Sequence, residues 1–172
     1  MDAEVAALIG AAVGSLATLG AAVVTGRTAA RSQYDQWRRQ HRRDAYVAYL
    51  GALHDRDIAL DAVFEALRPE RPDPEAVDEL VRTFIGLARE VHRAAEVVLV
   101  EGPPAMAAAV GRVARASGER AELMRRMVAD ARAGDTANKA AHTALAVRRD
   151  EALHQSVKGL RADAARVLDV PR

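Results

Sequence analysis

Cysteine is absent from this 172-residue chain, and aromatic residues make up only 3% of it. Without cysteine the chain forms no disulfide bond and has neither a thiolate nucleophile nor a cysteine metal ligand. Scarce aromatic residues, and no stretch in which β-branched and polar side chains alternate, argue against a β-sheet. Half of the residues are hydrophobic and alanine is abundant. Because alanine has the highest helix propensity, the composition predicts an all-α fold with one main core.

Charged residues are also missing from residues 5–26, a run of 22 residues. As a helix this run is about 33 Å long, which matches the roughly 30 Å hydrocarbon core of a bilayer. A secretory signal peptide would begin with positive charges, whereas Asp2 and Glu4 precede this run. A buried helix of a soluble protein would show a polar face. The sequence therefore predicts a transmembrane anchor over residues 1–26.

Small residues recur at every fourth position of this predicted span. Four-residue spacing places them on one stripe of a helix, where two helix backbones can approach closely in a membrane. The pattern predicts self-association of the span and a homo-oligomeric protein; the alternative is chance spacing in a segment rich in alanine and glycine. The predicted contact residues are Gly10, Gly14, Thr18 and Ala22.

Arginines crowd the segment that follows, residues 27–45, which also contains Trp37. Positive residues next to a span remain on the cytoplasmic side, so the N-terminus is expected outside and the rest of the chain in the cytoplasm. Arginine and tryptophan also suit the lipid headgroup region. Nucleic-acid binding is not expected, because the remainder of the chain is close to neutral. The predicted headgroup ligands are Arg27, Arg31, Arg38, Arg39, Arg42, Arg43 and Trp37.

The segment Gln36–Leu50, QWRRQHRRDAYVAYL, resembles a stretch of uncharacterised single-pass membrane proteins of high-GC actinobacteria. In these proteins a short span precedes an arginine-rich juxtamembrane helix and a helical tail. The resemblance covers about the first third of the chain. It implies the same architecture here, and it implies no activity and no functional residues.

Residues 46–172 carry helical apolar seams between turns rich in proline and glycine, which predicts an up-and-down bundle of about four helices with coiled-coil-like packing. The first of these helices is expected to continue directly from the span. Its seam has Asp57 between Leu53 and Leu60. Asp57 is interpreted as a residue at the helix edge or as a polar residue that sets the register of packing. The predicted helix ends are Pro69–Pro74, Gly102–Pro104 and the pair Gly134–Asp135, with Asp73 and Asp135 as caps.

Few residues of the sequence match a known catalytic or metal-binding motif. Glu151 and His154 form one Glu-x-x-His motif, whereas a di-metal site in a helical bundle needs two such motifs and further glutamates. No catalytic, cofactor or metal site is therefore expected. The sequence favours a membrane-anchored cytoplasmic scaffold that is not an enzyme and binds an unknown protein partner. One alternative is a membrane effector whose oligomerising span disturbs the bilayer, and another is a metal-dependent helical-bundle enzyme.

Overall fold

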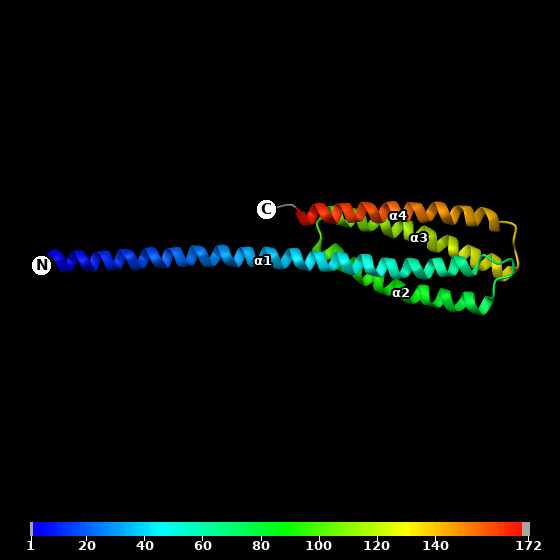
Figure 1. Cartoon of the computed structure of the whole chain (residues 1–172), viewed down its shortest axis with the longest axis horizontal. Helices are drawn as coiled ribbons and strands as arrows, with labels where there is room; N and C mark the ends of the chain where they lie inside the picture. The colour runs from blue at the N-terminus through cyan, green and yellow to red at the C-terminus, as the bar shows by residue number, and fades with distance from the viewer. Residues whose placement is uncertain (1, 170–172) are drawn as a thin grey trace. The chain divides into compact units, whose positions relative to one another are not determined.

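The computed structural model describes the backbone of residues 2–169 and the side chains of residues 30–169. Within these residues the chain forms four α-helices and no strand (Figure 1). The all-α prediction is confirmed, and the first helix includes the positions of Gly26 and Gly51 without a break. The helices are α1 (Asp2–Ala66), α2 (Pro74–Glu101), α3 (Pro104–Ala133) and α4 (Lys139–Asp169).

Helix boundaries in the bundle follow from proline and glycine. Asp73 caps α2 by accepting a hydrogen bond from the backbone N–H of Glu75 at 3.0 Å, and Pro74 occupies the first turn. At the end of α3, Gly134 has a φ of 69°, a left-handed conformation that glycine adopts without a Cβ penalty. The sequence predicted these two ends correctly.

The chain divides into two units, Met1–His41 and Arg42–Arg172. In the second unit, the C-terminal part of α1 and the three following helices run alternately up and down, joined by short turns (Figure 1). Each helix turns its apolar seam inward, so the helical bundle predicted from the seams is confirmed.

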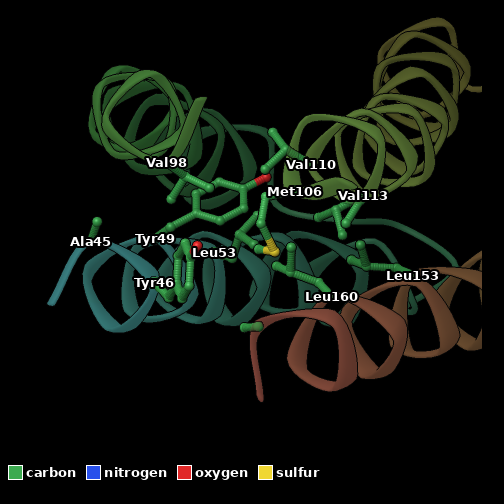
Figure 2. Close-up of a cluster of buried hydrophobic side chains, with 12 residues drawn as sticks. Ala45, Tyr46, Tyr49, Leu53, Val98, Met106, Val110, Val113, Leu153 and Leu160 are labelled. Atoms are coloured by element: carbon green, nitrogen blue, oxygen red, sulfur yellow. The ribbon is translucent and has the colours of Figure 1, made fainter. Parts of the chain in front are cut away.

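Two separate apolar clusters form the core of the bundle. The first joins all four helices and includes Tyr49, Leu53, Val113 and Leu153 (Figure 2). The second lies nearer the turn between α1 and α2. Its buried members are Leu60, Val63, Leu67, Val77, Phe84, Ala121, Leu123, Met124, Met127 and Val128.

Helix α4 differs from the prediction in three places. It begins at Lys139, because the Asp135 carboxylate accepts a hydrogen bond from the N–H of Ala137 at 2.9 Å and closes a turn within the loop. The sequence also predicts Ala141 and Ala152 in the buried seam of this helix, but both are exposed. The other predicted seam positions Leu153, Val157, Leu160 and Ala164 do pack into the core.

Candidate functional site

A layer of polar side chains separates the two apolar clusters. On α1 it contains Arg56 and Asp57, which lie between Leu53 of the first cluster and Leu60 of the second. On α3 it contains Ser117 and Arg120, which are 9% and 2% exposed. Burial of a charged group without partners is unfavourable, so the polar side chains of this layer need hydrogen bonds or ion pairs within the bundle.

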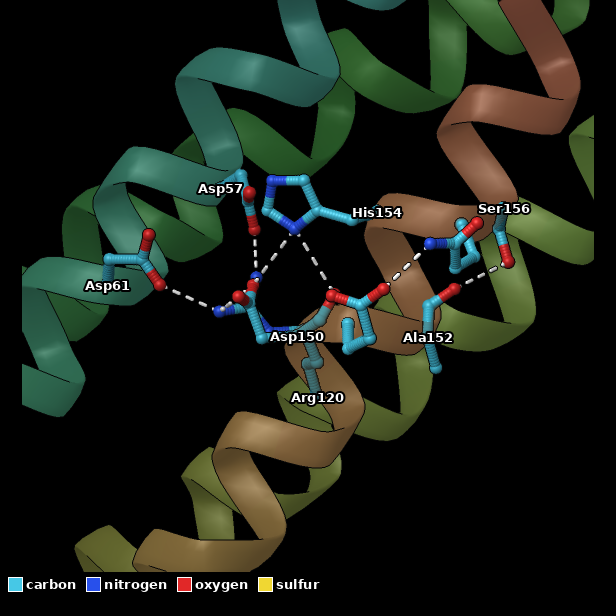
Figure 3. A network of polar contacts seen from close by, with 9 residues as sticks. Asp57, Asp61, Arg120, Asp150, Ala152, His154 and Ser156 are labelled. Carbon is cyan, nitrogen blue, oxygen red and sulfur yellow. Dashed lines mark hydrogen bonds and ion pairs between the residues drawn. The ribbon is translucent and has the colours of Figure 1, made fainter.

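Arg120 is surrounded by carboxylates from two neighbouring helices. Its Nη1 donates to Asp57 of α1, and its Nη2 lies 2.7 Å from Oδ1 of Asp61, also of α1 (Figure 3). The same Nη2 lies 3.2 Å from Oδ1 of Asp150 on α4. The ring of Phe64 lies 5.7 Å from the guanidinium carbon. One buried arginine of α3 therefore connects α1 and α4 electrostatically.

Asp57 is the carboxylate of this cluster most affected by its surroundings. Its side chain is 22% exposed, and burial raises the pKa of Asp57 above its usual value. Arg120 lowers this pKa, whereas the charges of Asp61 and Asp150 raise it further. The raised pKa means that the attraction of Arg120 does not fully offset the effect of burial on the Asp57 carboxylate.

His154 extends the network along α4. Its Nδ1 lies 3.5 Å from Oδ1 of Asp150 and 3.2 Å from the backbone oxygen of the same residue (Figure 3). Glu151, the other half of the metal motif in the sequence, accepts a hydrogen bond from Nε2 of Gln155 at 2.7 Å. The two residues of that motif therefore have different partners.

The carboxylate oxygens of Asp57, Asp61 and Asp150 lie within 4.8 Å of one another, a spacing that could suit a metal ion. Oxygen ligands of this kind are typical of Ca²⁺ and Mg²⁺ sites. The guanidinium of Arg120, however, donates hydrogen bonds to Asp57 and Asp61 and forms an ion pair with Asp150. A cation at that position would have to displace a buried arginine, so the residues present fit an internal ion-pair cluster better than a metal centre.

The predicted headgroup residues are divided between the two units: Arg42 and Arg43 begin the second unit, and the others belong to the first. Trp37 and Tyr34 are 60% and 57% exposed, and their ring centroids are 6.1 Å apart. The ring of His41 stacks on Trp37 at a centroid distance of 5.3 Å. Arg42 belongs to the bundle, where its Nε donates to the backbone oxygen of Glu101 at 2.7 Å. Arg31, Arg39 and Arg43 are exposed and Arg38 is half-buried.

The remaining predicted residues, Arg27 and the four small residues of the span, lie outside the residues whose side chains the structure describes. Among the described residues, no helix has a stretch long and apolar enough to cross a bilayer. The span expected at residues 5–26 lies outside this finding and stays a prediction.

The sequence pointed only partly to the buried cluster. In the sequence, Asp57 lies between Leu53 and Leu60 of one apolar seam, and Ser117 lies between Val113 and Ala121 of another. The structure places both in the polar layer. Asp57 is half-buried and pairs with Arg120 of α3, so it is not an exposed residue at the helix edge; its role in setting the register of packing stays a prediction. Arg120 could not be found in this way, because an arginine beside a seam is usually on the surface.

Models of known protein families, curated proteins and solved structures were each compared with this chain, and none matches it. The functional argument therefore depends on the residues described above.

Proposed function

We propose that this chain is a membrane-anchored helical interaction module that is not an enzyme. The observation that carries the proposal is the exposed aromatic and arginine-rich segment of α1 at residues 30–43. Trp37 and Tyr34 are large side chains that remain exposed, although burial of such rings normally stabilises a protein. Side chains of this kind, interleaved with arginines, suit the interface between lipid and water.

The anchor itself is proposed to be the uncharged run at residues 5–26, with the N-terminus outside the cell and the bundle in the cytoplasm. The proposed partner of the bundle is a protein. Exposed apolar side chains near the C-terminal end of α2 support this part of the proposal, because they offer apolar area for a contact. They are Val97, Leu99 and Val100, which are 44%, 40% and 78% exposed.

Membrane fractionation of the full-length chain tests the anchor. We expect the chain to remain in the membrane pellet after washing with 1 M salt or with alkaline carbonate, because a spanning helix is released by neither. Release by salt alone would mean that arginines hold the protein peripherally through headgroup charge. That outcome would contradict the anchor and leave residues 5–26 as part of a soluble fold.

Self-association of the span is a separate proposal, which the four-residue spacing of small residues supports. We expect substitution of Gly10 and Gly14 by Leu to reduce cross-linked dimer in membranes by about tenfold, because the larger side chains keep the backbones apart. Substitution of Ala11 and Ala12 by Leu is the matched control, since these residues lie off the stripe. Equal dimer in all variants would contradict association through this stripe.

A further inference from the structure

The outward surface of α1 in the bundle is acidic and partly apolar. Between residues 44 and 65 its exposed side chains include four carboxylates and no lysine or arginine. Two large apolar side chains on the same face, Val47 and Ile58, are 62% and 55% exposed. Exposed apolar side chains rimmed by polar ones are typical of a contact surface. The carboxylates belong to Asp44, Asp55, Asp61 and Glu65.

The outward surface of α4 has the opposite charge. Between residues 144 and 166 its exposed side chains include four basic groups and one carboxylate. This carboxylate, Glu151, already accepts a hydrogen bond from Gln155. Val147, which is 68% exposed, and several exposed alanines lie among the basic groups. The basic residues are Arg148, Lys158, Arg161 and Arg166, of which Arg166 also pairs with Asp163 on its own helix.

The charges of the two surfaces match along the length of the bundle. Helices α1 and α4 run in opposite directions (Figure 1), and Asp57 and Asp61 of α1 have carboxylate oxygens within 4.8 Å of that of Asp150 on α4. Both helices rise about 1.5 Å per residue, so a step forward along α1 corresponds to a step back along α4. Counted from the level of Asp150, three pairs of opposite charge lie within about one helical turn of each other in height. They are Asp44 and Arg166, Asp55 and Lys158, and Asp61 and Arg148.

We propose that the outward surface of α1 binds the outward surface of α4 of a second copy of this chain, anchored beside it in the same membrane. The contact rests on the proposed anchor, because two copies inserted in one orientation bring matching levels of α1 and α4 to the same height. Complementary charges in register favour this pairing, whereas two α1 surfaces would repel each other through their carboxylates. Because the two surfaces differ, the contact is head-to-tail and leaves one surface of each kind for further copies.

Small residues between the charged pairs allow a close approach of the two helices. Gly51 of α1 has no atom within 4 Å of the position that a Cβ would take. Ala48 of α1 and Ala162 of α4 are exposed at matching levels. One helix from each copy forms a smaller contact than the roughly 1,600 Å² of a typical stable interface. The shared membrane therefore strengthens the contact by raising the effective concentration of the second copy.

Disulfide cross-linking tests the contact, since the chain has no cysteine of its own. Two full-length chains with different tags, one with Ala48→Cys and the other with Ala162→Cys, are co-expressed and oxidised in isolated membranes. We expect at least tenfold more dimer between the two tags than between chains of the same tag. The matched control pairs Ala48→Cys with Ala108→Cys, an exposed alanine of α3 near the same level. Equal amounts of mixed and same-tag dimer, or as much dimer in the control, would overturn the contact.

A charge exchange tests the register of the two surfaces. Asp55→Lys in the Ala48→Cys chain should reduce the mixed dimer about fivefold, because a lysine then faces Lys158. Lys158→Asp in the Ala162→Cys chain should restore it, since the pair is then reversed. Both positions are exposed, so neither change disturbs the core. A mixed dimer that Asp55→Lys leaves unchanged, or that Lys158→Asp does not restore, would overturn the assigned register.

The same membranes separate failure of the contact from failure of the anchor. Chains that stay in washed membranes without the mixed cross-link would overturn the contact and leave the anchor intact. If salt releases the chains, the anchor fails, and the two tagged chains are then oxidised after release. Mixed dimer in excess of same-tag dimer would support the contact in that case, and its absence would overturn it.

Discussion

Replacement of Arg120 by Met is expected to lower the free energy of unfolding by about 3–5 kcal/mol at pH 7. Met retains an apolar side chain of similar length, so the change removes mainly the charge and the donors of the guanidinium. Asp57, Asp61 and Asp150 then face one another across less than 4.8 Å without a cation. Carboxylates in such a position repel, and the most buried of them, Asp57, has the least access to water.

The loss of unfolding free energy caused by Arg120→Met should become smaller as the pH falls. In the Arg120→Met variant the pKa of Asp57, which burial already raises, rises further because the opposing charge is gone. A carboxyl group whose pKa is higher in the folded than in the unfolded state takes up a proton on folding, so acid stabilises the fold. We therefore expect the difference in unfolding free energy between the variant and the natural chain to decrease as the pH falls below 7 and Asp57 takes up its proton.

Urea unfolding followed by circular dichroism measures this effect. The control is Arg125→Met, because Arg125 is exposed on the same helix and, among the described side chains, pairs only with Glu122, three residues away. Such surface pairs contribute about 0.5 kcal/mol or less. If Arg120→Met were no more destabilising than Arg125→Met, or if its effect grew in acid, the buried cluster would not stabilise the bundle as described.

Neutralising four arginines beside the proposed span is expected to disturb its orientation. The variant carries Gln at Arg31, Arg38, Arg39 and Arg43. Positive residues near a span resist translocation, so their loss removes the main signal that keeps the bundle in the cytoplasm. We expect the natural chain to show one orientation and the variant to show a mixture, with about half of the molecules reversed.

The absence of cysteine makes this measurement direct, because one introduced thiol is the only thiol in the chain. Ala144→Cys places it at an exposed position of α4. A membrane-impermeant maleimide should label this thiol in intact cells only when the bundle is outside. The matched control replaces four exposed arginines remote from the span, at Arg89, Arg93, Arg115 and Arg148. Labelling of the natural chain in intact cells would contradict the proposed orientation.

Most of the fold could be predicted because local chemistry determines it. Pro74 and Pro104 sit in the first turns of helices, and Gly134 takes the left-handed conformation that ends one. These effects depend only on neighbouring residues. The start of α4 was predicted wrongly because Asp135 has two local uses, as a cap or within a turn. Its hydrogen bond to the N–H of Ala137 belongs to the second use.

The candidate site was less predictable because its members are distant in sequence. Asp57 and Ser117 each interrupted an apolar seam, but neither interruption shows by itself that the two lie in one layer of the bundle. Arg120 and Asp57 are 63 residues apart, and Arg56 and Ser117 are 61 apart. Such contacts depend on which helices pack together. A periodic sequence pattern shows only which face of each helix is buried, not which helix that face contacts.

The buried cluster also affects the order in which the bundle can assemble. Arg120 receives two of its three carboxylates from α1 and the third from α4. A hairpin of α3 and α4 that formed first would hold this arginine beside Asp150 alone, and the donors that bind Asp57 and Asp61 would have no carboxylate partner. Docking of α1 supplies these two carboxylates as acceptors and joins both apolar clusters in the same step. Loss of α1 should therefore unfold both halves of the bundle together, which makes the whole bundle one cooperative unit.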